Sequence, residues 1–152
     1  MPGPDAHRLA ANDVTLILVT LFEGGEQSLF ILLDAEGLVN RMGNGSVDDI
    51  EREMFIGKAD LDLFQQLHAK LTPEVLQWFG QQLEAPQMRG KICELTVTLK
   101  QADGRELMTA WRYGSQSQGP PPEVRDFVVA AIDATDPWFE QQKARVRGPP
   151  LP

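Results

Sequence analysis

The stretch VTLILVTLFEGGEQSLFILLD, residues 14–34, decides the fold of this chain. Two runs of β-branched and aliphatic side chains, at 14–22 and 29–33, flank the turn-forming sequence EGGE and predict a β-hairpin. Both alternating faces of each strand are largely apolar, which indicates a central place in a sheet with cover on both sides. A second turn and a further apolar run at 38–42 predict a third strand, so the N-terminal part forms a meander.

Helical signals dominate the part of the chain that follows. Ser46 and Asp49 match a capping box and slightly favour a helix start, although the run MFI shortly afterwards could equally form a short strand. Asp60 is a natural N-cap for a helix over 60–71, and a Thr-Pro pair predicts a second helix over 72–83. A loop is expected before the chain returns to strand periodicity.

A second hairpin is predicted in the C-terminal half. Apolar and polar side chains alternate strictly over 93–100, so one face of this strand is predicted to be buried and the other wet. An Asp-Gly turn leads into an antiparallel return strand over 107–113. Apolar spacing then predicts a helix over 124–132, and an Asp-Pro pair predicts the start of a separate short helix over 136–143.

The order of these elements favours an α+β fold over a parallel βαβ fold. We expect an antiparallel sheet built from an N-terminal meander and a later β-hairpin, with helices packed on it. A length of 152 residues suits one domain. We place this domain at 14–144, between a flexible N-terminal segment at 1–13 and a flexible Pro-rich tail at 145–152.

Composition excludes several classes of function. The chain has 22 acidic and 14 basic side chains and a formal net charge of -8, which argues against nucleic acid and anionic membranes as partners. One cysteine and two histidines cannot supply an internal disulfide or a structural zinc site, and we expect no cofactor. The N-terminus lacks the basic start and apolar core of a signal peptide, so a cytoplasmic location is expected.

No catalytic motif outweighs a structural explanation of the same residues. The sequence SQSQG at 115–119 approaches a nucleophile elbow but lacks its first glycine. Cys93 lies in register with core residues, and His68 lies on the apolar stripe of its helix, so packing roles are favoured over a thiolate or a general base. Whether the protein is an enzyme stays open, and the sequence leans against it.

Acidic residues concentrate at 34–62, where eight acids and three bases give a local charge of -5. This segment is a candidate docking surface for a basic protein partner. A solvated face with acids at helix N-termini is the main alternative, and a hard-cation site is a weaker one. The candidate partner-binding residues of this acidic segment are Asp48, Asp49, Glu51, Glu53, Asp60 and Asp62.

A second candidate patch lies in the later hairpin. Trp111, Arg112 and Tyr113 interleave aromatic and basic side chains, a composition typical of recognition surfaces. Core packing of Trp111 is an equally good interpretation. For this patch, as for the acidic segment, a purely structural role is the alternative to partner binding.

The leading hypothesis is a non-enzymatic protein-binding module, of the inhibitor, immunity or adaptor type, that uses an acidic surface or a sheet face. One alternative is a small enzyme or small-ligand binder with a pocket between sheet and helices, in which His68 or Glu94 would act. Another is a self-assembling structural protein, in which the hairpin at 14–33 supplies a homodimer interface.

Overall fold

The computed structural model describes residues 13–45 and 53–147. Its strands are β1 (Val14–Glu23), β2 (Glu26–Asp34), β3 (Leu38–Gly43), β4 (Phe55–Lys58), β5 (Gln82–Glu84), β6 (Ile92–Gln101) and β7 (Glu106–Gly114). Its helices are α1 (Leu61–His68), α2 (Pro73–Leu76) and α3 (Pro122–Arg147). The strands form one seven-stranded sheet in the order β4-β3-β2-β1-β6-β7-β5. The prediction of an α+β fold with a largely antiparallel sheet is confirmed.

The sheet is mixed, because the edge strand β5 pairs parallel to β7 while every other neighbouring pair is antiparallel. The sequence predicted a helix through residue 83, but α2 ends at Leu76. Gly80 has a φ of +91°, which turns the chain out of the helix. Its N–H donates to the carbonyl of Met108 at 2.8 Å, and the next residues continue along β7 as β5.

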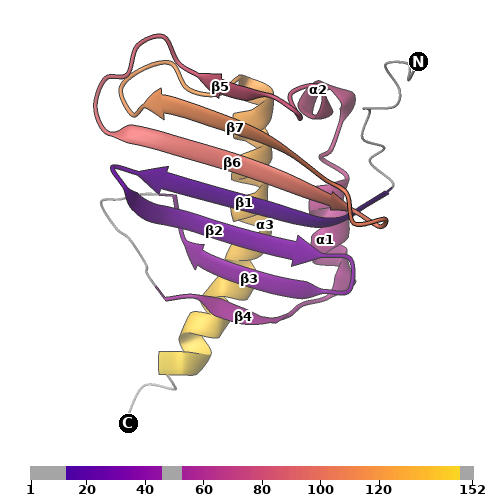
Figure 1. Cartoon of the computed structure of the whole chain (residues 1–152). Helices are drawn as coiled ribbons and strands as arrows, with labels where there is room; N and C mark the ends of the chain where they lie inside the picture. The colour runs from indigo at the N-terminus through magenta and orange to yellow at the C-terminus, as the bar shows by residue number, and fades with distance from the viewer. Residues whose placement is uncertain (1–12, 46–52, 148–152) are drawn as a thin grey trace, which may run out of the picture.

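The helices in the described part of the chain cover only one face of the sheet (Figure 1), which corrects the expectation of cover on both sides of the first hairpin. In Figure 1, α3 crosses behind the strands and α1 lies behind the same face, while α2 packs on α3 near β5. The core between sheet and helices contains fully or almost fully buried side chains: Ile17, Val19, Ile31, Leu33, Leu95, Val97, Leu99, Phe64, Leu67, Val124, Phe127 and Ala131. None of the described helices lies on the opposite face.

The C-terminal helix is continuous where two helices were predicted, and Pro137 lies inside it. Proline cannot donate the backbone hydrogen bond of a helix interior, and its ring crowds the preceding turn. The residues on both sides of it nevertheless pack against the core, since Ala131 before the proline and Phe139 after it are both buried. The burial of one apolar stripe of α3, from Val124 to Phe139, outweighs the local penalty.

The ambiguous segment before α1 forms an edge strand, β4, rather than a helix where the structure describes it. Residues 46–52, with the expected capping box, lie outside the described residues. The indole Nε1 of Trp138 donates to the carbonyl of Lys58 at 3.2 Å, so α3 occupies one of the outward hydrogen-bonding groups of this edge.

Candidate functional site

The acidic segment is only partly described by the structure. Asp48, Asp49 and Glu51 lie outside the described residues, and Glu53 is exposed. Asp60 is the N-cap of α1, where its carboxylate accepts the N–H of Asp62 at 3.4 Å. Negative charge at a helix N-terminus interacts favourably with the helix dipole and stabilises the helix, so Asp60 and Asp62 already have a structural role. Among the described residues, no three His, Cys, Asp or Glu side chains are grouped so that they could hold a metal ion.

The residues of the second candidate patch do not share one surface. Successive side chains of β7 alternate between faces, so Trp111 and Tyr113 lie on the helix side and Arg112 on the other. Trp111 donates from Nε1 to Oγ1 of Thr109 at 2.8 Å and packs edge-on against Trp78, with ring centroids 5.5 Å apart. The two aromatic side chains therefore belong to the core side of the sheet.

The face of the sheet without helices, here called the open face, has an uncharged centre. Strand pairing places its side chains in rows that run across the strands. The first central row contains Gln82, Ala110, Thr96, Thr20, Phe30 and Met42. The second central row contains Met108, Thr98, Leu18, Leu32, Asn40 and Ile56. Neither row contains an Asp, Glu, Lys or Arg, and together they reach from one edge strand to the other.

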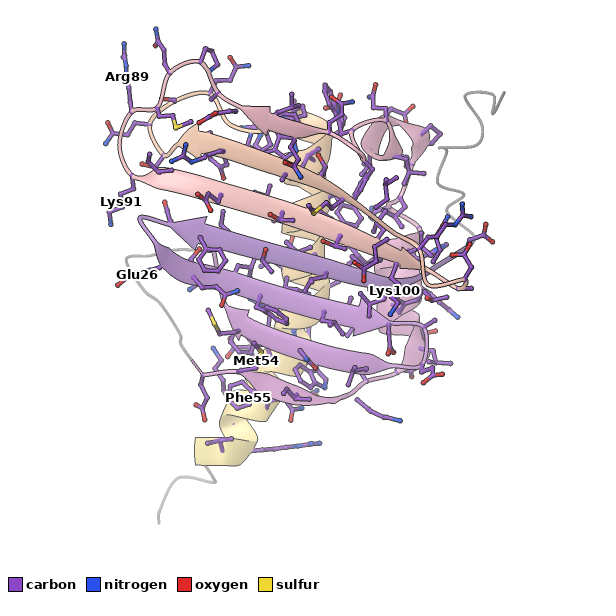
Figure 2. The ribbon with its side chains drawn as sticks, viewed as in Figure 1. Glu26, Met54, Phe55, Arg89, Lys91 and Lys100 are labelled. Carbon is purple, nitrogen blue, oxygen red and sulfur yellow. The ribbon has the colours of Figure 1, made fainter. Side chains whose placement is uncertain are left out.

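Charged residues flank this centre on both sides. The Arg112 row contains Glu84, Arg112, Glu94, Phe22 and Gln27, and the Lys100 row contains Glu106, Lys100, Leu16 and Asp34. Arg112 forms ion pairs with Glu84 at 2.7 Å and with Glu94 at 3.4 Å, which bridge three strands. Figure 2 shows Lys100 near one end of the strands. The open face thus has an uncharged centre and a charged rim.

Large apolar side chains are exposed on this face. Ile56 is 68% exposed, Met108 39% and Phe22 37%. A hollow of about 370 Å³ is lined by residues of β5, β6 and β7. The small side chain of Ala110 forms part of its lining, together with Gln82 and Thr96 of the same row. The lining also includes Glu84, Glu94 and Arg112 of the Arg112 row. A protruding apolar residue and a hollow therefore occupy neighbouring positions of β7.

A second hollow, of about 410 Å³, lies between β4, α1 and α3, and its lining includes Lys58, Asp62 and Gln141. Burial raises the pKa of the Cys93 thiol to about 11, and the nearby charge of Glu23 adds to this effect. Burial likewise raises the pKa of Tyr113 to about 12. Neither of these two groups lines either hollow, so their raised pKa values are not associated with these two sites.

One notable polar side chain was not singled out from the sequence. Arg41, counted as a base of the acidic segment, points into the core and is fully buried. Its guanidinium lies 4.4 Å from the ring centroid of Phe139, and Nη1 donates to the Thr135 hydroxyl at 2.8 Å and to Asp136 at 2.9 Å. In the sequence, the only sign of this burial is strand alternation. Asn40 lies beside Leu32 on the open face, so the next residue, Arg41, points to the helix side.

Part of the open face was predictable from sequence. Strict alternation over 93–100 predicted that Glu94, Thr96, Thr98 and Lys100 share a wet face, and all four lie on the open face.

Within the described residues, no helix combines the length and apolar character that crossing a bilayer requires. No protein-family model matches the sequence, and no curated protein matches it.

Proposed function

We propose that this chain is a non-enzymatic protein-binding module and that the open face of its sheet is the contact surface. The observation that carries the proposal is the uncharged centre formed by the two central rows. The solvent side of an antiparallel sheet is ordinarily polar. Protein interfaces, by contrast, are depleted of charge at their core and polar at their rim. The open face has the second arrangement.

The size of the face fits this function. With strands about 4.8 Å apart and rows about 6.7 Å apart, the 21 residue positions that the four rows contain cover a projected area of roughly 700 Å². A standard protein interface buries about 800 Å² on each partner. The exposed side chains of Ile56, Met108 and Phe22 supply apolar area that a partner would remove from water. The hollow lined by Ala110 offers space for a side chain of the partner.

A charge placed in the second central row tests the proposal. Thr98→Lys introduces a cation at the centre of the face, and Met108→Lys does so at a more exposed position. Gln65→Lys adds the same charge on α1, on the helix side of the sheet. Each full-length variant is immobilised and exposed to extract of the native host, and bound proteins are quantified by mass spectrometry. Circular dichroism confirms that each variant is folded.

We expect a partner that is retained by the unmodified chain and by Gln65→Lys but reduced at least tenfold on both open-face variants. A buried, unpaired cation at an interface core costs several kcal/mol, which is why the loss should be large. Equal retention by Gln65→Lys and the two open-face variants would contradict the proposal, because it would place the contact elsewhere.

A further inference from the structure

We propose that the occupant of the open face is a second copy of this chain, packed sheet to sheet about a two-fold axis that crosses the strands between the two central rows. The inference rests on the proposed function, since it takes the open face as the contact surface and adds the partner. A two-fold interface is self-complementary: whatever residue i contacts on the second copy, that residue contacts i in return.

This axis exchanges the rows in pairs. The first central row of one copy lies over the second central row of the other, and the Arg112 row lies over the Lys100 row. Each strand faces the same strand of the second copy, running in the opposite direction. Sheets that pack face to face keep their strands within about 30° of alignment, so this correspondence is closest near the middle strand, β1.

Strand β7 carries a steric match for this arrangement. Met108 lies in the second central row and Ala110 in the first, so Met108 of one copy faces Ala110 of the other. Met108 is 39% exposed, and Ala110 helps to line the hollow of about 370 Å³. The flexible, unbranched methionine side chain suits an irregular hollow. The two-fold axis generates this contact twice.

The rim carries an electrostatic match. On β6, Glu94 lies in the Arg112 row and Lys100 in the Lys100 row, so each carboxylate faces an ammonium of the other copy. On β7, Arg112 faces Glu106 in the same way. Both β6 and β7 thus bring opposite charges together across the proposed interface. The two-fold axis brings the two ends of the same strand together. A strand with the same charge at both ends would therefore repel its copy.

The middle strand adds an apolar match. On β1, Phe22 of one copy faces Leu16 of the other, and Leu18 faces Thr20. Phe22 is exposed while the other three side chains are partly buried in the single chain. The middle strand therefore contributes no charge to the contact. The proposed interface has uncharged side chains at its centre and complementary charges on β6 and β7.

Sedimentation velocity of the full-length chain over a range of micromolar concentrations tests self-association. We expect a concentration-dependent dimer for the unmodified chain and for Gln65→Lys, and at least tenfold weaker dimerisation for Thr98→Lys and Met108→Lys. A chain that stays monomeric throughout, or a dimer that all four proteins share, overturns the inference.

A charge exchange tests the two-fold pairing itself. Glu94→Lys gives a chain with lysine at both positions 94 and 100, and Lys100→Glu gives a chain with glutamate at both. Each variant alone should dimerise on the order of tenfold more weakly than the unmodified chain at low salt, because like charges then meet at two symmetric positions. A mixture of the two should form a heterodimer with opposite charges at both positions, as strong as the original dimer. If the mixture is no stronger than the single variants, this pairing is wrong.

The two proposals fail in different ways. If the chain is monomeric but Thr98→Lys and Met108→Lys still lose a captured partner that Gln65→Lys retains, the second copy is wrong and the protein-binding function stands. If the open-face variants change neither self-association nor partner capture, both proposals fail. All of the tests use intact chains. A heterodimer that appears only when the two charge variants are mixed shows that both variants are folded and able to pair.

Discussion

At the scale of single residues, Arg41 combines a full positive charge with complete burial. Desolvating a guanidinium is costly, and the cost is recovered only when hydrogen bonds and an opposite charge surround it. Here Nε donates to the carbonyl of Gly43 at 2.9 Å, while Nη1 pairs with Asp136 at 2.9 Å. Asp136 is itself 47% exposed, so the pair joins the core to the surface of α3. Arg41 therefore connects β3 to the helix across the core.

Truncating this side chain should be strongly destabilising. Arg41→Ala removes the ion pair and leaves a cavity beside Phe139, and we expect the free energy of unfolding to fall by about 3 to 4 kcal/mol. Arg41→Met keeps an unbranched side chain of similar length against the ring, so its loss should be roughly half as large. Urea denaturation measures both. Equal losses would show that the polar contacts, rather than the packing, determine the effect.

At the scale of elements, the end of β3 depends on a glycine. Gly43 has a φ of +74°, and a Cβ at this position would overlap the carbonyl oxygen of Ser28 on β2. Gly43→Ala should therefore lower the free energy of unfolding by about 2 to 3 kcal/mol, because backbone strain and a steric clash add together. Thermal or urea unfolding of the variant gives the value.

The matched control is Gly25→Ala, in the turn between β1 and β2. Gly25 has a similar φ of +83°, but nothing lies within 4 Å of the position that its Cβ would occupy. It should lose only about 1 kcal/mol, the cost of the backbone conformation alone. A loss as large as that of Gly43→Ala would mean that the close approach of β2 contributes nothing.

Elements with strong periodicity were predictable, and elements that depend on distant packing were not. Strict alternation identified β6 and its two faces, because one side of that strand is apolar and the other polar. Strand β5 has three exposed residues and exists only because it pairs with β7, so no local pattern could indicate it. Pro137 was a strong local stop signal, but the apolar stripe of α3 continues past it.

The same limit applies to the candidate site. In β1 and β2 both faces are apolar, and the sequence alone cannot tell which face the helices cover. The open face can be recognised only once the strand order and register are known, because its residues come from strands across the whole sheet. Trp111 and Arg112 were grouped by sequence adjacency, whereas neighbours on one face of a strand are two residues apart.

At the scale of the whole molecule, most of the charge is separated from the centre of the proposed contact surface. The chain carries a formal net charge of -8, yet the two central rows of the open face contain no charged residue. A net charge far from zero favours solubility and opposes unspecific association, whereas a neutral patch is compatible with one specific contact. This division of the surface is what connects the composition of the chain to the proposed binding function.

Stability of the whole fold should decline at alkaline pH. Burial raises the pKa of Cys93 from 9.0 to about 11 and that of Tyr113 from 10.0 to about 12. Below the unfolded pKa values both states hold these protons, and the free energy of unfolding is unaffected. As pH rises through about 9 to 12, the unfolded chain loses the protons first, so the free energy of unfolding falls.

The double variant Cys93→Ala with Tyr113→Phe removes both titrations while keeping the side chains apolar. Its free energy of unfolding, measured in urea between neutral and strongly alkaline pH, should decrease less steeply than that of the unmodified chain. Lysine deprotonation affects both proteins alike and cancels in the comparison. Parallel pH profiles would contradict the assignment, because they would mean that the folded core does not hold these two protons more tightly than the unfolded chain does.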